Sequence, residues 1–316
     1  MTDGLSGLIV TQQPTTRRLR FIEQAWLGRN AWWRYLVAIG LLIVLYWASI
    51  VLLSVIYEVV ARSNDVLPSI FSAPDDSGDL GLVHFGLALA AIASGLPILI
   101  LVVRLFHRRS WRTLVVGPQG FDWSAFFHSL GLILAINLFY VFVVMTIWPG
   151  AQLAVGDSDR FLIFVTMAAA LVPLQTLAEE AVFRGYLLQG VARASRNFAV
   201  RLIVPALLFA VVHFNNPIVA SGGLWILLDY VIVALYLTFL TLRSDGIERS
   251  WGFHLGNDWL AFIFIRPAAG DFDIPTLIVV DGAYGPSLVV VVSICCALHY
   301  ALLLRFRAPR SRQWGQ

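Results

Sequence analysis

The chain has 316 residues, of which 59% are hydrophobic and 13% are charged, and its mean hydropathy is +0.79. This composition excludes an ordinary soluble domain and predicts an all-α protein that crosses a membrane several times. All 22 basic residues are arginine, and the net charge of +3 is too small to indicate nucleic-acid binding. The adjacent Cys295 and Cys296 predict no disulfide framework.

Eight apolar segments are expected to cross the membrane as helices. The fourth begins near Arg160 and carries two adjacent acids towards its end. The other seven cover approximately residues 35–59, 82–106, 124–148, 198–214, 223–242, 250–265 and 286–306. The sequence therefore predicts a basic N-terminal segment (1–34), an eight-helix membrane domain (35–306) and a short tail (307–316).

The arginines predict how these segments are oriented. If the N-terminus lies inside the cell, the outer loops hold only Arg62, Arg160 and Arg266, and one more arginine lies within the fourth span. The inner segments hold the other eighteen, namely Arg17, Arg18, Arg20, Arg29, Arg34, Arg104, Arg108, Arg109, Arg112, Arg193, Arg196, Arg201, Arg243, Arg249, Arg305, Arg307, Arg310 and Arg312. Because cytoplasmic loops are enriched in basic residues, both termini are expected in the cytoplasm, with the protein in an inner or plasma membrane.

Five acidic side chains remain at membrane depth, namely Glu58, Glu179, Glu180, Asp229 and Asp258. Ionisable groups there are costly, and they usually face a protein interior or a water-filled cavity where they have a function. Glu58 lies near an outer helix end and is expected to extend its carboxylate towards the interface. Asp229 is interpreted either as a residue that faces a cavity or as a contact between packed helices.

The strongest candidate for a functional site is the segment 179–184, which reads Glu-Glu-Ala-Val-Phe-Arg. On a helix, Glu180 and Arg184 lie on one face because they are four residues apart, so they can form an ion pair. Glu179 lies about 100° around the helix from Glu180. One carboxylate can therefore have a structural role while the other takes part in chemistry.

Two histidines lie within polar clusters. His213 ends an apolar helical run, and His254 is followed by Asn257 and Asp258 at positions that share its helix face. His299 has no evident partner in the sequence and is expected to have a packing role.

A predicted hairpin brings the first acidic motif and His213 together. Residues 193–197 are expected to form the turn between two antiparallel helices, and Glu179 and His213 are equally distant from the middle of this turn. Equal rise along both arms puts the two side chains at the same depth. Phe209 is then expected opposite Phe183, as a packing layer beneath the site.

The same geometry leaves the fifth span short. His213 lies near the cytoplasmic side, so its helix must continue past Asn215 and Asn216 to reach the outer face, or the hairpin must project from the membrane. His254 lies a few residues into the seventh span, about 6–10 Å from its cytoplasmic end, which is a similar depth.

A carboxylate, two imidazoles and an amide or second carboxylate suit hydrolysis. A glutamate can take a proton from water, an imidazole can orient that water or bind a metal, and a second histidine can donate to an oxyanion. Glu179, His213 and His254 could also hold zinc and leave a fourth position for water. In that case Glu179 could not also act as the free base, so a mechanism without a metal cofactor is favoured.

Together these motifs resemble the CPBP family of intramembrane proteases, which is also called the CAAX-protease and bacteriocin-processing (ABI) family. The resemblance covers about residues 160–265 and rests on three motifs, namely Glu179-Glu180-x-x-x-Arg184, Phe209-x-x-x-His213 and His254 with Asn257 or Asp258. It implies an eight-helix fold like that of CAAX prenyl endopeptidases, with a cavity open to the cytoplasm.

The resemblance also implies a role for each motif. Glu179 would activate water together with His213, and His254 with its downstream partner would stabilise the oxyanion. The acid–arginine pair of the first motif would support them. The family usually has Asn or Asp four residues after the histidine, which selects Asp258, although Asn257 is also available.

The predicted function is hydrolysis of peptide bonds in membrane-associated substrates, such as CAAX-type proteins or bacteriocin-like peptides. These substrates and the lipid bilayer are the expected partners. A non-catalytic immunity or partner-binding protein of the same fold is a second interpretation, although such a scaffold need not keep both histidines. A transporter that relays protons through buried acids is a third, but the sequence lacks the inverted repeats typical of that class.

Overall fold

The computed structural model describes residues 19–63, 67–71, 79–214, 216–267, 274–280 and 285–306. In chain order its elements are η1 (Phe21–Leu27), α1 (Trp32–Arg62), α2 (Asp79–Val102), η2 (Val103–His107), α3 (Arg112–Val115), α4 (Trp123–Ile147), β1 (Ala151–Leu153), α5 (Ser158–Glu180), η3 (Ala181–Leu187), α6 (Leu188–Ala194), α7 (Phe198–Val212), α8 (Pro217–Ser244), α9 (Glu248–Trp259), η4 (Leu260–Phe264), β2 (Ile265–Pro267), β3 (Ile278–Val280) and α10 (Pro286–Arg305). Element η1 is a 3-10 helix, and η2, η3 and η4 are π-helical. The predicted tail, 307–316, and the first 18 residues of the predicted N-terminal segment lie outside the described residues.

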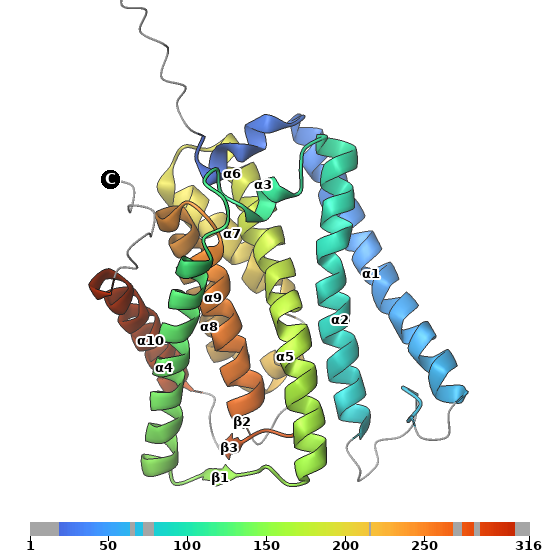
Figure 1. Cartoon of the computed structure of the whole chain (residues 1–316), viewed down its shortest axis with the longest axis vertical. Coiled ribbons are helices and arrows are strands. Elements are labelled where there is room, and N and C mark those ends of the chain that lie inside the picture. The colour runs from blue at the N-terminus through green and yellow to red at the C-terminus, as the bar shows by residue number, and fades with distance from the viewer. Residues whose placement is uncertain are drawn as a thin grey trace, which may run out of the picture.

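The helices form a bundle with two different ends (Figure 1). Elements η1, α3 and α6 lie at one end, called the η1 end below, and the three strands lie at the other, called the strand end. Helix α1 packs mainly against α2 and leans away from the bundle towards the strand end. Helix α9 lies among α4, α5 and α8, so its side chains can reach three neighbouring helices.

Six helices among the described residues are long and apolar enough to cross a membrane. They are Trp32–Arg62, Asp79–His107, Trp123–Ile147, Ser158–Ala194, Gly222–Ser244 and Pro286–Arg305. The protein is therefore an integral membrane protein, as its composition predicts. The fifth and seventh predicted spans correspond to shorter helices, because α7 has 15 residues, about 22 Å in length, and α9 has 12 residues before η4 begins.

Of the two alternatives expected for the fifth span, the continuation of α7 past Asn216 does not occur. The helix ends at Val212 with His213 as its C-cap, and the next helix begins at Pro217. A residue that precedes proline is disfavoured in the α-conformation, and Asn216 accordingly has an extended backbone with φ −62° and ψ 129°. His213 therefore lies at the C-terminal end of α7, and α8 begins at Pro217.

Helix α9 packs very closely against α4 through two glycines. A Cβ atom on Gly252 would lie 2.5 Å from the Phe126 carbonyl oxygen, and one on Gly256 would lie 2.5 Å from the Ile133 side chain. Small residues four apart let two membrane helices approach this closely. Because His254 lies two residues from each glycine, about 200° around the helix, it points away from α4.

The short strands link two distant loops at the strand end. Strand β3 is central, pairing antiparallel with β1 and parallel with β2. Ile278 and Val280 of β3 are buried and pack with Val144 near the end of α4. This small sheet ties the segment after α9 to the loop between α4 and α5.

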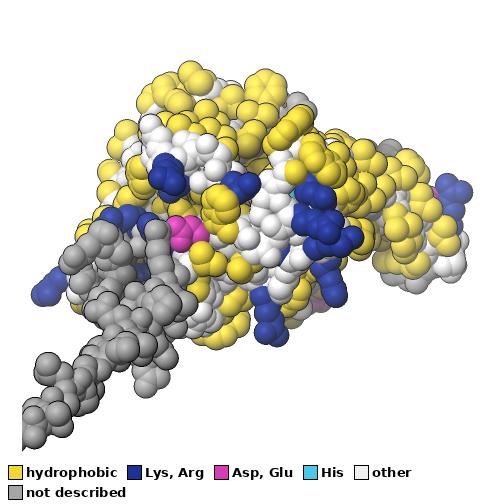
Figure 2. All heavy atoms as spheres, turned by 90° about the horizontal axis from the view of Figure 1, so that it is seen from above, with side chains coloured by type: hydrophobic (Ala, Val, Ile, Leu, Met, Phe, Trp, Pro, Cys, Tyr) yellow, Lys and Arg dark blue, Asp and Glu magenta, His cyan; other side chains and the backbone are white. Residues whose placement is uncertain are grey.

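The η1 end carries many of the arginines (Figure 2). Seen from this side, dark blue side chains lie at several places across the face. Phe21 and Ile22 of η1 are buried beneath, whereas Trp26 is 58% exposed, as expected of an interfacial tryptophan. Arg17, Arg18, Arg307, Arg310 and Arg312, which also support the predicted orientation, lie outside the described residues.

Glu58 does not extend into the interface as expected. Its side chain is buried and accepts hydrogen bonds from Arg62 Nε at 2.7 Å, from the Ser69 hydroxyl at 2.8 Å and from the Ile70 amide at 3.2 Å. The carboxylate therefore fastens the loop after α1 onto the helix. The sequence did not show this role because Ser69 and Ile70 reach it only by a turn of the chain.

Candidate active site

The site begins where α5 changes its helical geometry. Glu179 and Glu180 are the last two residues of α5, and the π-helical segment η3 follows at once. π-Helical turns are rare and occur frequently at functional sites, because the wider turn changes the direction of the side chains around it. The predicted helix is therefore present, but its regular α-geometry ends at the acidic pair.

Glu180 and Arg184 form the predicted ion pair inside the bundle. Arg184 Nη1 donates to Glu180 Oε1 at 2.9 Å, and both side chains are fully buried. Arg184 also donates to the Ala234 carbonyl oxygen at 3.4 Å, and its guanidinium lies 4.8 Å from the centre of the Phe209 ring. Buried charges need such partners, because removal of either one leaves the other uncompensated.

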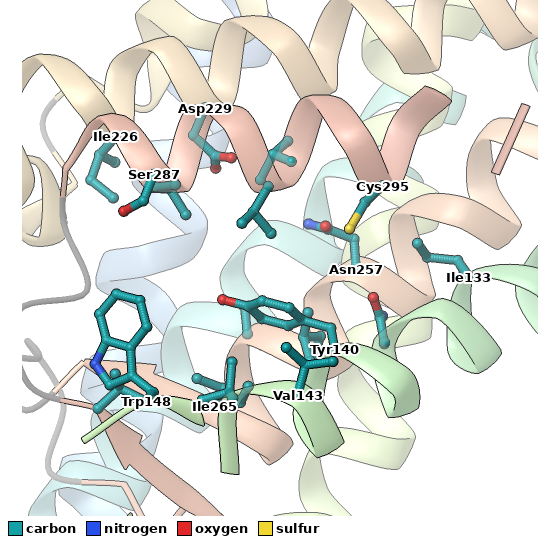
Figure 3. Close-up of a pocket in the computed structure, with 18 of the residues that line it drawn as sticks. Ile133, Tyr140, Val143, Trp148, Ile226, Asp229, Asn257, Ile265, Ser287 and Cys295 are labelled. Atoms are coloured by element: carbon teal, nitrogen blue, oxygen red, sulfur yellow. The ribbon is translucent and has the colours of Figure 1, made fainter. Parts of the chain in front are cut away.

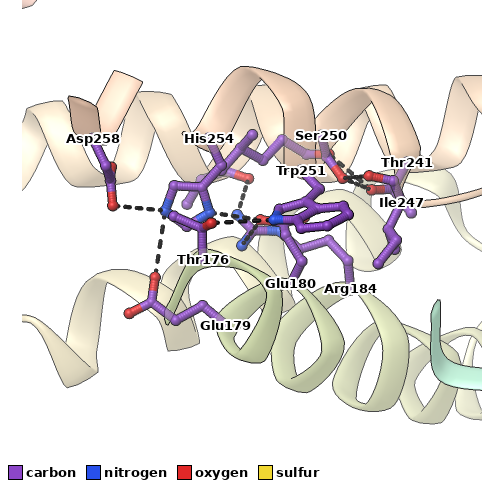
Figure 4. A network of polar contacts seen from close by, with 12 residues as sticks. Thr176, Glu179, Glu180, Arg184, Thr241, Ile247, Ser250, Trp251, His254 and Asp258 are labelled. Atoms are coloured by element: carbon purple, nitrogen blue, oxygen red, sulfur yellow. Dashed lines mark hydrogen bonds and ion pairs between the residues drawn. The ribbon is translucent and has the colours of Figure 1, made fainter. Parts of the chain in front are cut away.

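His254 connects the two glutamates (Figure 4). Its Nδ1 lies 2.9 Å from Glu180 Oε1, and since a carboxylate only accepts, Nδ1 carries the hydrogen. The opposite nitrogen, Nε2, lies 3.4 Å from Glu179 Oε2 and 3.6 Å from Asp258 Oδ2. Both distances exceed that of an ordinary hydrogen bond, so Nε2 faces two carboxylates without being tied to either.

His213 approaches Glu179 from the other side. Its Nδ1 lies 2.7 Å from the Phe209 carbonyl oxygen, which makes Nδ1 the donor and leaves Nε2 as an acceptor. This Nε2 is 3.9 Å from Glu179 Oε1. A polar pair at that separation can share a water molecule. Glu179, with a side chain 10% exposed, therefore has an imidazole nitrogen beside each of its oxygens.

The hairpin geometry expected from the sequence is confirmed. The turn falls at residues 195–197, between α6 and α7, and it brings His213 to the depth of Glu179. The Phe183 and Phe209 rings pack edge to face with centres 5.0 Å apart, which is the predicted layer beneath the site. Equal rise on two antiparallel helices accounts for both results.

Asn257 and Asp258 lie on different sides of α9. Asp258 faces His254, whereas Asn257 lines a separate cavity that also includes Asp229. The structure thus groups six of the seven candidate residues, namely Glu179, Glu180, Arg184, His213, His254 and Asp258. The seventh, Asn257, is adjacent to Asp258 in the sequence but does not belong to this group, because its side chain lines the other cavity.

Two further side chains at the site were missed by the sequence analysis. Tyr230 of α8 packs its ring against His213, with ring centres 4.6 Å apart, and its hydroxyl accepts a hydrogen bond from the Asn216 side chain at 3.0 Å. Gln175, one helical turn before Glu179, is buried on the same face of α5 as that carboxylate. The position of Gln175 on the Glu179 face of α5 was a usable signal, whereas Tyr230 comes from a helix without a motif.

A contact between α5 and α9 fixes the relative position of the two halves of the site. Trp251 Nε1 donates to the Thr176 hydroxyl at 3.2 Å, and both residues are buried or nearly so. Thr176 lies four residues before Glu180, and Trp251 lies three residues before His254. The bond therefore lies one turn from the Glu180–His254 contact and sets the register of the two helices.

Zinc held by Glu179, His213 and His254 is the alternative that the sequence leaves open. A tetrahedral zinc centre needs three or more protein donors that converge on one point, about 2.0–2.3 Å from each of them. Within the described part of the chain, no group of three or more His, Cys, Asp or Glu side chains is arranged to hold a metal ion. Glu180 and the Nδ1 of His254 are already joined to each other. The steps proposed below use only side chains and water.

The sequence is similar to known proteins over the same region. Residues 160–260 match the family described as Type II CAAX prenyl endopeptidase Rce1-like, and this match confirms the predicted resemblance to the CPBP family. Over 248 residues the chain is 28% identical to "Uncharacterized protein YyaK" of Bacillus subtilis (strain 168), which covers 75% of this chain and 79% of that protein. No solved structure matches the chain.

Proposed function

From the match of residues 160–260 to the Rce1-like family, we propose that this protein is an intramembrane endopeptidase. Its substrates would be membrane-associated proteins or peptides, with CAAX-type proteins and bacteriocin-like peptides as the two classes that the family suggests. The observation that carries the proposal is the environment of Glu179, which has an imidazole nitrogen 3.4 Å from one carboxylate oxygen and another 3.9 Å from the second.

In the proposed reaction, Glu179 is the general base. A water molecule bound between Glu179 and His213 donates one hydrogen to the carboxylate and the other to His213 Nε2, which is held as an acceptor by the Phe209 carbonyl. Glu179 takes the first proton as the water oxygen attacks the peptide carbonyl carbon. The carbonyl π-electrons move to oxygen, and the resulting tetrahedral intermediate carries a negative charge there.

His254 would stabilise that charge. With Nδ1–H directed to Glu180, a doubly protonated His254 has its Nε2–H free to donate to the oxyanion, and Asp258 at 3.6 Å favours this charged form. When the C–N bond breaks, Glu179 returns its proton to the leaving amine. The products are a carboxylic acid and an amine, and Glu179 is again a carboxylate.

Glu180 and Arg184 are positioning residues in this scheme. Arg184 keeps Glu180 charged and in place, and Glu180 in turn fixes the tautomer and orientation of His254. The same arrangement, in which a third group orients the histidine that acts on substrate, recurs among hydrolases on unrelated folds.

A Glu179→Gln variant tests the proposal. Purified protein in liposomes would be given a prenylated CAAX peptide or an unmodified membrane peptide, and cleavage would be followed by mass spectrometry. Cleavage should fall to background while the fold is retained, because the amide has nearly the same shape but cannot accept the proton. Glu58→Gln is the matched control, because it changes a buried acid that does not belong to the site. This variant should cleave the peptide at the normal rate. Retained cleavage by Glu179→Gln would disprove its role as base.

The metal-free mechanism needs its own measurement. Chelator-treated protein, shown by elemental analysis to lack metal, is expected to cleave the same peptide at an unchanged rate. Loss of cleavage on chelation, restored by one equivalent of zinc, would show instead that a metal activates the water.

We also propose that the chain crosses the membrane eight times, with the η1 end in the cytoplasm. The six long helices would be joined by α7 and by α9 with η4, and the arginines at the η1 end would face the cytoplasm. Single cysteines placed in the loops 63–78 and 268–285 of a cysteine-free chain should react with an impermeant reagent from outside intact cells. Labelling of either loop only after the cells are opened would reverse or change this topology.

A further inference from the structure

A second cavity lies beside α9, apart from the residues of the proposed active site. It has a volume of about 330 Å³ and is bounded by α4, α8, α9 and α10 together with the ends of β2 and β3. None of the six grouped site residues lines it. Its volume falls at the lower end of the range of about 300–1,000 Å³ that is typical of small-molecule sites.

Most of the cavity wall is apolar. Its lining residues include Tyr140 and Val143 of α4, Ile226 of α8 and Val291 of α10. Figure 3 shows the side chains of Tyr140, Val143 and Ile226 around the cavity. An alkyl chain is the kind of group that such a wall accepts, because it has no polar atom that would lose a hydrogen bond there. The cavity lies among helices that are long and apolar enough to cross a membrane.

One carboxyl group interrupts this apolar wall. Asp229 of α8 lines the cavity, and its Oδ1 is buried without a hydrogen-bond partner among the described residues. A buried carboxylate in an apolar wall is costly unless a cation or a donor joins it. Asp229 Oδ1 therefore has neither a cation nor a hydrogen-bond donor beside it among the described residues.

We propose that this cavity binds a single-chain amphiphile with a protonated amine, its ammonium group paired with Asp229 and its alkyl chain along α4 and α10. The side-chain amide of Asn257 and the hydroxyl of Ser287 also line the cavity and can hydrogen-bond to the same head group. An ammonium group supplies both the missing positive charge and the missing donors. A neutral alcohol of the same chain length supplies only a donor.

The cavity is connected to the proposed active site through one helical turn of α9. Asn257 lines the cavity, and the next residue, Asp258, faces His254 on the other side of the helix. A bound ammonium group would therefore lie two side chains from the imidazole. The binding proposal itself does not depend on proteolysis, because it rests only on the cavity and on Asp229.

The test uses two photoreactive probes on the full-length protein in liposomes. One is dodecylamine with a diazirine in its chain and a terminal alkyne, and the other is the matched dodecanol. Cross-linked peptides are identified by mass spectrometry. The amine is expected to label α4 and α10 about tenfold more strongly than the alcohol, the ratio that corresponds to about 1.4 kcal/mol of binding free energy. Unlabelled dodecylamine should compete this labelling away.

Variants then connect the preference to Asp229. Asp229→Asn should lower amine labelling about tenfold, to the level of the alcohol, whereas Glu58→Gln should leave it unchanged. Val291→Trp should fill the cavity and lower labelling by both probes. Equal labelling by the two probes in the unaltered protein would show an apolar-chain site only and would overturn the proposal, as would amine labelling that persists in Asp229→Asn. If that variant fails to fold, the probe ratio and the competition in the unaltered protein decide.

Discussion

His254 and His299 are both buried in this bundle, and they have different kinds of partner. His299 on α10 has Tyr236 Oη at 2.6 Å from Nδ1 and the Ser129 carbonyl oxygen at 3.1 Å from Nε2, so both ring nitrogens are bonded to neutral groups. His254 on α9 bonds Glu180 through Nδ1, but its Nε2 stands 3.4 Å or more from the nearest carboxylate oxygens. Both residues are at most 3% exposed.

The difference separates a structural histidine from one that is available for chemistry. All the hydrogen-bonding capacity of His299 is used within the protein, so substrate has no nitrogen to contact. His254 keeps one nitrogen directed at the carboxylates and any water between them. Burial and a membrane location are common to both, and the partners alone distinguish them.

The largest expected effect concerns the ion pair that holds His254. Glu180→Gln or Arg184→Leu should each lower the free energy of unfolding by about 3–5 kcal/mol, because each leaves a buried charge without its partner. Unfolding in a denaturing detergent, followed by circular dichroism, measures this loss. The comparison is Arg62→Leu, since Arg62 is 73% exposed and its pairing with Glu58 should matter much less. Equal losses in the two pairs would contradict the structural role of Glu180.

The second expected effect concerns catalysis, and it tests whether the two histidines differ in function. His254→Gln is expected to slow peptide cleavage by about 100- to 1,000-fold, as loss of one oxyanion donor does in other hydrolases. The fold should persist, which unfolding measurements on the same variant would verify. His299→Gln is the matched control and should cleave at close to the normal rate. Equal losses of activity would mean that the two histidines do not differ in function.

The smallest expected effect concerns the hydrogen bonds of His299, the structural histidine. Tyr236→Phe removes only the hydroxyl that bonds His299, and it should destabilise the protein by about 1–3 kcal/mol because a buried ring nitrogen loses its partner. The cleavage rate of the remaining folded protein should not change. A slower rate with unchanged stability would indicate that the His299 network reaches the site.

The positions of the site residues along the chain allowed much of their grouping to be predicted. Helical spacing predicted the Glu180–Arg184 pair, and the symmetry of the hairpin predicted the approach of His213 to Glu179. Both inferences depend on the constant rise and rotation per residue of a helix. The same geometry places Phe183 and Phe209 side by side on the two arms of the hairpin.

Other features depend on contacts that spacing does not encode. The choice between Asn257 and Asp258 as the neighbour of His254 depends on how α9 is rotated about its axis, and that rotation is set by the packing of Gly252 and Gly256 on α4. The bonds from Ser69 and Ile70 to Glu58 depend on the path of a loop. The π-helical segment after Glu180 has no residue type that predicts it.

The close packing of α9 on α4 has a consequence for how a substrate reaches the site. With Gly252 and Gly256 leaving no room for even one added carbon atom, the two helices must move as one rigid body. This body presents His254 and Asp258 as a fixed wall. The Thr176–Trp251 and Glu180–His254 bonds also tie α5 to this body, so any opening that admits a polypeptide must come from α7 on the other side of Glu179. Substrate entry would then displace His213 alone, and Glu179, His254 and Asp258 would keep their positions throughout.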